Sequence, residues 1–245
     1  MITEPQAIAG RTLRAEHIHP ALWRASQLAR PHGRHIDTGF NDLSAQLPGQ
    51  GWPLGCLVEI LAPQPGAGEM QLLRPALILS AKQRIALIQP PYTPQIAAWA
   101  NWGGQASQLL WIRPKHATDS LWATEQILRS DTFGAALLWQ STVRSQALRR
   151  LHLAAQQSNT LLVMLRSPAE ARQPCAAPLR LGLRPAAQGL LVSILKRRGP
   201  ACEHAIPIIL HPERAYSSSG AHHVSLDQPS SAPPQPGRRF SSLAH

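Results

Sequence analysis

The stretch PQPGAGEMQLL, residues 63–73, has the shape of a phosphate-binding loop, but its chemically active end is altered. In a loop of the form GxxxxGK[ST], backbone N–H groups surround the phosphates, the lysine neutralises charge and the hydroxyl binds magnesium. Gly66, Ala67 and Gly68 keep the turn possible, whereas Glu69 and Met70 replace the lysine and the hydroxyl. A like charge at ~4 Å costs on the order of 4 kcal/mol at an effective dielectric of ~20. We therefore expect a strand-to-helix turn, with Glu69 at the helix start, and no ordinary ATP site.

No other stretch offers the groups that catalysis would need. The ends of the neighbouring strands, QPPY (89–92) and LWQS (138–141), contain no acid that could hold magnesium or orient water. The chain has 11 histidines, but none pair at i, i+4 with a third ligand nearby, so we expect no metal site. We expect no catalysis and no cofactor.

Basic residues dominate the charge of the chain. The sequence of 245 residues has 24 Lys and Arg against 13 Asp and Glu, a net charge of +11. Most of this excess lies between residues 141 and 200, where Glu170 is the one acid. The balance favours a polyanion or an acidic protein surface as a partner. The candidate contact residues are Arg144, Arg149, Arg150, Arg180, Arg184, Lys196, Arg197 and Arg198.

Short apolar runs alternate with longer amphipathic ones between Gly55 and Arg166. Nearly continuous apolar runs are typical of strands covered on both faces, and strict alternation with helices indicates a mainly parallel α/β sheet. In the helix expected at 119–130, Trp122 and Leu128 face inward and Glu125 faces outward. The expected strands are 56–62, 84–89, 108–113, 134–140 and 160–166, and the expected helices are 69–81, 94–102, 119–130 and 145–157.

The alternation of apolar and amphipathic runs ends after Arg166. LRLGLRP and LLVSILKRR, separated by the turn-like AAQG, predict an antiparallel hairpin added to the sheet. Its cations either contact phosphates or protect a solvated edge strand, and the sequence leaves both interpretations open. We expect an N-terminal helix and arm at 1–35, a core at 36–210, and a disordered Ser/Pro-rich tail at 211–245.

Tryptophan and cysteine give two further expectations. Of the seven tryptophans, Trp52 lies in a loop and is either a partner anchor or packed beneath the loop. The others are expected in the core or, for Trp23, packing the N-terminal helix: Trp99, Trp102, Trp111, Trp122 and Trp139. Cys56, Cys175 and Cys202 are odd in number and widely spaced, which favours a reduced, cytoplasmic protein. No secretion signal and no apolar run long enough for a membrane span is present, so we expect no membrane contact.

The stretch HIDTGFNDLSAQLPGQGWPLGCLVEILAPQPGAGEMQLL resembles the start of the RecA core. The likeness continues through IALIQPPYTPQIAAWANWGGQASQLLWIRP and reaches GAALLWQS, which corresponds to the magnesium-binding strand of that family. The family's catalytic glutamate falls near Pro91 and its strand-end aspartate at Trp139 or Gln140. The resemblance implies a RecA-like sheet flanked by helices whose ATP chemistry has been lost.

Further stretches resemble the ImuA group of RecA-like proteins, from about Leu47 to Pro200: LPGQGWPLGCLVEILAP, GEMQLLRPAL, LIQPPYTP, LWATEQILRS, RRLHLAA, LLVMLR and LKRRGP. This resemblance implies a DNA-damage-induced, non-catalytic accessory protein of error-prone translesion DNA synthesis. The implied partners are an ImuB-like Y-family protein, a DnaE-type error-prone polymerase and RecA, with weak contact to DNA.

Two alternatives remain open at this stage. The SulA group, inhibitors of cell division that bind FtsZ, is similar in the VEI…MQLLRPAL and RSDTFGAALLW regions but lacks so basic a hairpin. An active RecA-type ATPase is disfavoured by the missing lysine and acids.

Overall fold

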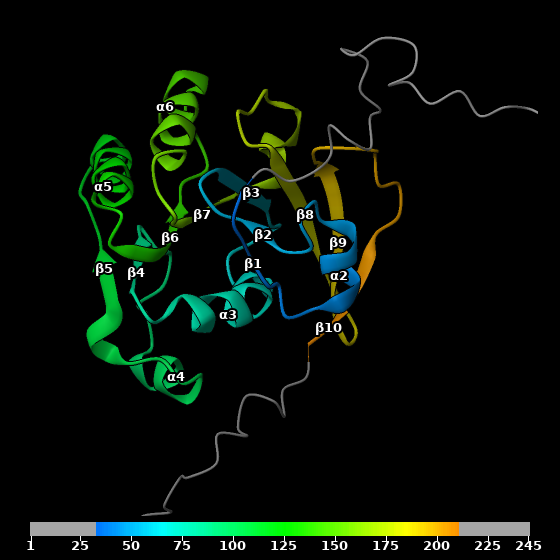
Figure 1. The fold of residues 1–245 in the computed structure, drawn as a ribbon, viewed down its shortest axis with the longest axis horizontal. Helices are drawn as coiled ribbons and strands as arrows, with labels where there is room; N and C mark the ends of the chain where they lie inside the picture. The colour runs from blue at the N-terminus through cyan, green and yellow to red at the C-terminus, as the bar shows by residue number, and fades with distance from the viewer. Residues whose placement is uncertain (1–32, 211–245) are drawn as a thin grey trace, which may run out of the picture.

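An eight-stranded sheet forms the centre of the computed structural model, which describes residues 33–210 (Figure 1). The strand order is β10-β9-β8-β3-β7-β6-β4-β5. The expected N-terminal helix, Trp23 and the Ser/Pro-rich tail lie outside the described residues. The strands are β3 (Leu57–Leu61), β4 (Arg84–Ile88), β5 (Leu109–Ile112), β6 (Phe133–Trp139), β7 (Leu161–Arg166), β8 (Leu179–Ala186), β9 (Gly189–Lys196) and β10 (Ile206–Ile209).

The sheet is mainly parallel, as the alternation of strands and helices predicts. Strands β8, β3, β7, β6, β4 and β5 run parallel to one another. The expected hairpin is confirmed as β8 and β9, which pair in antiparallel fashion. Strand β10 then pairs with β9 and forms the sheet edge, and the sequence reasoning missed it. A separate two-stranded sheet joins β1 (His35–Ile36) to β2 (Trp52–Pro53).

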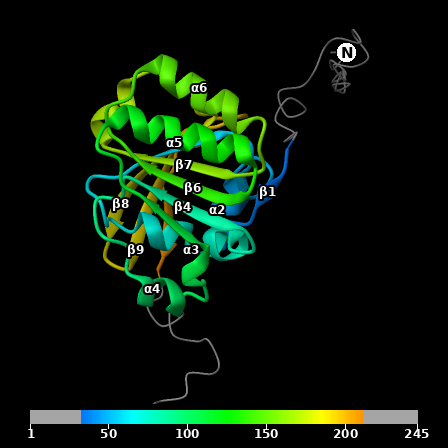
Figure 2. The same ribbon diagram turned by 90° about the vertical axis from the view of Figure 1, so that its left-hand side faces the viewer.

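Helices cover both faces of the sheet (Figure 2). Helices α3 (Glu69–Ser80) and α4 (Ile96–Asn101) lie on one side, and α5 (Ala117–Ser130) and α6 (Ser145–Ala155) lie on the other. These four helices match the expected ranges to within two residues at each end. The shorter elements are helix α2 (Asn41–Gln46) and the 3-10 turns Ala106–Gln108 and Pro168–Arg172.

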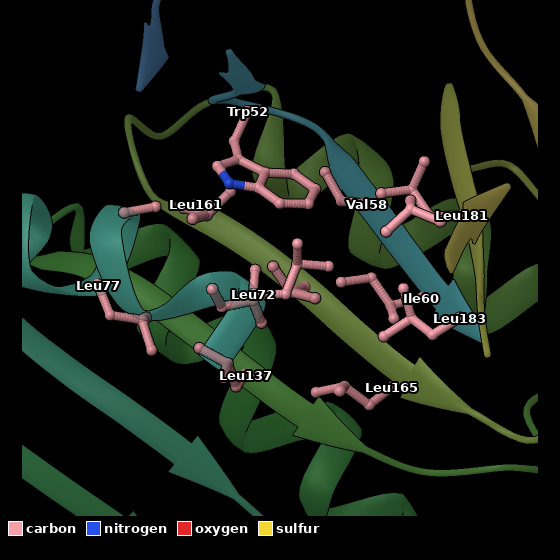
Figure 3. Packing of buried hydrophobic residues seen from close by; sticks show 14 of the residues in the cluster. Trp52, Val58, Ile60, Leu72, Leu77, Leu137, Leu161, Leu165, Leu181 and Leu183 are labelled. Atoms are coloured by element: carbon pink, nitrogen blue, oxygen red, sulfur yellow. The ribbon is translucent and has the colours of Figure 1, made fainter. Parts of the chain in front are cut away.

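Two hydrophobic clusters fill the layers, because the central strands point apolar side chains to both faces. Along β7, Leu161 and Leu165 join the cluster beneath α3, whereas Met164 joins the cluster beneath α5 and α6. Figure 3 shows the first cluster, in which Leu72 and Leu161 pack close to Trp52. This double burial explains why the strand sequences lack a polar alternation.

Two expectations about buried faces are wrong. Trp122 of α5 is 63% exposed, and Glu125, expected outside, is only 5% exposed. The reason is that α5 packs against α6 as well as the sheet, and Glu125 pairs with Arg150 of α6 at 2.8 Å. Trp111, expected in the core, is 43% exposed because β5 is an edge strand.

The remaining expected core tryptophans lie at least partly inside. Trp99 is buried, and Trp102 and Trp139 are partly buried against the first cluster. Within residues 33–210, no helix has the length and apolar character needed to cross a bilayer.

Candidate functional site

The loop between β3 and α3 is closed by its own glutamate. Gly66 and Gly68 have φ angles of +82° and +109°, which glycine adopts without strain, and Gly68 caps the N-terminus of α3. Glu69 is the first helical residue, as expected, and is only 2% exposed. Its Oε1 accepts a hydrogen bond from the Gly66 N–H at 2.7 Å. A backbone donor of the kind that would bind a phosphate is therefore already bonded to a carboxylate of the chain.

Packing behind the loop holds this arrangement in place. A Cβ atom on Gly68 would lie 2.9 Å from Cδ2 of Leu190, so the hairpin packs directly against the turn. The second oxygen of Glu69, Oε2, is buried and has no hydrogen-bond donor among the described residues. The carboxylate lies at the helix N-terminus, where the helix dipole stabilises negative charge.

A mainly apolar pocket of about 210 Å³ adjoins the closed loop, and we call it the aromatic pocket. It lies beside the ends of β4 and β6, where the resemblance places the family's catalytic acids. Pro91 and Trp139, the residues at those positions, line the pocket. Gly66, Glu69, Met70, Leu87, Pro90, Pro91, Tyr92, Thr93, Pro94, Gln95, Ala98, Trp99, Trp102, Leu109 and Trp139 line this pocket.

Polar atoms at the end of β6 are buried without partners. Among the described residues, neither the Trp139 Nε1 nor the Gln140 Oε1 has a hydrogen bond. Tyr92 is 67% exposed at the pocket and Ile96, at the start of α4, is 47% exposed. An apolar pocket with exposed aromatic and aliphatic side chains suits a hydrophobic contact better than a nucleotide triphosphate.

A buried network of ion pairs joins β3 to its two neighbours in the sheet, β7 and β8. Glu59 of β3 accepts hydrogen bonds from Arg166 of β7 at 2.7 Å and from Arg180 of β8. Arg166 also bonds Glu170 Oε2 at 2.6 Å. Because the three strands are adjacent in the sheet, the network fixes their relative positions.

Arg180, predicted as a contact for nucleic acid, is instead part of this buried network. It is 8% exposed, and its guanidinium bonds Glu59 and the backbone oxygens of Ala171 and Glu170. A buried and fully engaged guanidinium is not available to a phosphate. Its function is to brace the sheet.

The other predicted cations do not form one continuous face. Arg144, which caps α6, and Arg149 are exposed, while Arg150 is paired with Glu125. Arg184 is exposed opposite Leu191, about four residues and roughly 13 Å along β8 from Arg180. Lys196 lies opposite Arg180 at the other end of the hairpin. The hairpin cations are thus divided between opposite ends of the sheet.

Arg197 and Arg198 enter a second, larger pocket of about 530 Å³, which we call the basic pocket. It lies at the amino-terminal ends of β3, β7 and β8, whereas the closed loop follows the carboxyl-terminal end of β3. Sequence reasoning missed Arg34, His35 and His152, because the pocket combines segments that are distant in sequence. Gly33, Arg34, His35, Pro48, Pro53, Leu54, Gly55, Cys56, His152, Gln156, Ser158, Asn159, Pro178, Leu179, Arg197 and Arg198 line the pocket.

The two histidines and the cysteine of the basic pocket have pKa values shifted toward their neutral forms. Burial lowers the pKa of His152, and the positive charges of Arg198 and Lys196 lower it further. Burial also lowers the pKa of His35, against an opposing hydrogen bond with Gly33. Burial raises the pKa of the Cys56 thiol to about 11, although Arg198 acts in the opposite direction. Cys56 is therefore a packing residue and a poor nucleophile.

Trp52, the candidate partner anchor, is fully buried with 0% exposure. It packs beneath the loop within the first hydrophobic cluster (Figure 3), which is the second of the two interpretations that the sequence left open. The three cysteines are free thiols. Within residues 33–210, no group of three or more His, Cys, Asp or Glu residues is arranged to hold a metal ion.

The chain matches no known protein-family model, and no curated protein is significantly similar to it.

Proposed function

We propose that this protein is a non-catalytic accessory protein of SOS-induced, error-prone translesion DNA synthesis, built on a RecA-like sheet that no longer uses ATP. The observation that carries the non-catalytic part is the hydrogen bond from the Gly66 N–H to Glu69 Oε1 at 2.7 Å. It fills the loop with the chain's own negative charge and repels a triphosphate. The choice of pathway rests on the sequence resemblance to the ImuA group.

The proposed partners are an ImuB-like Y-family protein, a DnaE-type polymerase and RecA. The aromatic pocket supports a protein contact, because Tyr92 and Ile96 present exposed apolar surface beside it. A cytoplasmic location fits both this pathway and the three free thiols.

Binding of magnesium-ATP tests the non-catalytic part. Isothermal titration calorimetry of the full chain should detect no ATP binding. The Glu69→Ala variant should release the Gly66 N–H and still bind ATP poorly, because the lysine and hydroxyl remain absent. Tight binding of magnesium-ATP by the wild-type chain would contradict the proposal, and its loss in Glu69→Ala would show that Glu69 takes part in that binding.

A paired pull-down tests the pathway. The tagged full chain should retain an ImuB-like protein and leave FtsZ in the supernatant. Overproduction should not cause filamentous cells. Capture of FtsZ together with filamentation would instead assign the chain to the SulA-like function.

The same pull-down locates the partner surface. Tyr92→Ala should weaken capture, whereas Leu79→Ala, which removes a side chain that is 54% exposed outside the aromatic pocket, should not. Equal effects of the two variants would exclude the aromatic pocket as the contact.

A further inference from the structure

All the charged residues that line the basic pocket are basic. Three arginines and two histidines line it, and none of its lining residues is acidic. The nearest acid bonded to a lining residue is Asp131, whose two oxygens accept hydrogen bonds from the backbone and side-chain nitrogens of Asn159. Within the part of the chain that the structure describes, the wall of the cavity therefore supplies no carboxylate to its arginines.

Two of the arginines are held in place by uncharged acceptors. Arg34 Nη1 donates to Asn159 Oδ1 at 3.1 Å. Arg197 Nε donates to the Pro200 carbonyl at 2.7 Å, and its Nη1 donates to the Gln46 carbonyl. These bonds orient the guanidiniums and do not neutralise them. Each arginine keeps further donors for an anion.

The third arginine completes the set of cations. Arg198 lines the pocket together with His152 and Cys56, and its positive charge acts to lower the pKa of both groups. His152 Nδ1 accepts the Leu57 N–H at 3.3 Å, and its Nε2 lies 3.4 Å from the side-chain nitrogen of Gln156, so both ring nitrogens already have a neighbour within the chain. The N–H donors that the pocket offers to an anion are therefore those of its three arginines.

The fold explains why the charge gathers here. Strand β9 ends with Lys196, and Arg197 and Arg198 come directly after it, at the end of the sheet where the parallel strands begin. The 530 Å³ volume lies within the usual range for small-molecule sites, about 300–1,000 Å³. Planar guanidiniums match the oxygens of a phosphate and give no base specificity.

We propose that the basic pocket binds phosphate groups of a nucleic acid strand, with Arg34, Arg197 and Arg198 as the cations that contact them. The phosphate chemistry follows from the pocket itself. The choice of nucleic acid as the source rests on the proposed function. The phosphate contact then lies at the opposite end of the strands from the closed loop.

Fluorescence anisotropy with the full chain and a 3′-labelled single-stranded oligonucleotide tests the proposal over a salt series. Arg34→Gln/Arg198→Gln should lower affinity at low salt by about tenfold or more and reduce the salt slope by about 1.4, for two lost phosphate contacts. The matched control is Arg113→Gln/Lys115→Gln, which removes the same charge from exposed positions beyond the end of β5, outside the pocket. The control should change affinity less than about twofold.

If the two double variants lose affinity for the oligonucleotide equally, the basic pocket is not the binding site, because net charge alone would then explain binding. Circular dichroism must show the same fold in both variants, and Arg198→Gln alone should give about half the change in slope. If the mononucleotide dAMP binds as tightly as the oligonucleotide in an Arg198-dependent way, the nucleic acid assignment is wrong. If anisotropy shows no binding of the oligonucleotide, the phosphate site is wrong. The pull-down with the ImuB-like protein does not depend on that result, so it still tests the proposed function by itself.

Discussion

Replacing Glu59 by glutamine should destabilise the fold more than any surface change. The Glu59 side chain is fully buried and is the carboxylate that Arg166 and Arg180 share. Glutamine keeps the shape but removes the negative charge and can accept at only one oxygen. Among the described residues, Arg166 would retain Glu170 at 2.6 Å, whereas Arg180 would retain only backbone carbonyls.

The size of the effect follows from this difference. Removing one partner of a buried ion pair costs about 3–5 kcal/mol, because a buried charge is left uncompensated. For a domain of this size, about 1 kcal/mol shifts Tm by roughly 2–4 °C. We therefore expect Glu59→Gln to lower Tm by roughly 6–20 °C.

Urea denaturation followed by tryptophan fluorescence measures the free energy of unfolding. Glu203→Gln, at an exposed position, is the control and should stay within about 0.5 kcal/mol of the wild type. The double variant Glu59→Gln/Arg180→Met should recover part of the loss, because it removes the uncompensated charge. A cost below about 1 kcal/mol for Glu59→Gln, or no recovery in the double variant, would refute the reasoning.

Three smaller predictions concern the loop and the basic pocket. Gly68→Ala should lower the free energy of unfolding by about 1–3 kcal/mol in urea denaturation, because its φ of +109° strains any other residue. His152 has a lowered pKa in the native state, so the unfolded chain binds more protons as pH falls through about 6.5. Stability should then fall between about pH 7.5 and 5.5, and less steeply in His152→Gln, when unfolding is measured across that range. Cys56, with a pKa of about 11, has about one thiolate in a thousand at pH 8, so mass spectrometry should show slower alkylation by iodoacetamide than at Cys202.

The sheet could be predicted because its strands carry a simple signal. Runs such as CLVEILA and TLLVMLR are apolar on both faces, and the helices between them repeat at the helical period. Strand β10 escaped prediction because IPII is only four residues long and contains a proline, which is tolerated at a sheet edge. The faces of α5 were misjudged because the hydrophobic period cannot show that a second helix packs alongside.

The sites were harder to predict than the fold. The closed loop could be inferred locally, since Glu69 and Gly66 are three residues apart. The burial of Arg180 could not, because its carboxylate partner Glu59 lies 121 residues away. One clue was present: a charged residue in the middle of the apolar run LVEIL must find an opposite charge if the strand is buried.

The two ends of the parallel strands carry pockets of different chemistry. In open parallel sheets, ligands normally bind beyond the carboxyl ends of the strands. Here that end carries Glu69 and the apolar aromatic pocket, whereas the amino ends carry the three arginines of the basic pocket, which has no acidic lining residue within residues 33–210. Strand β3 has five residues, so its first and last Cα atoms are roughly 13 Å apart. At this separation, a protein bound at the aromatic pocket and a phosphate backbone bound at the basic pocket need not compete. The buried ion network of β3, β7 and β8 lies between the two ends. If both proposals hold, this network would keep the two partners at a fixed spacing.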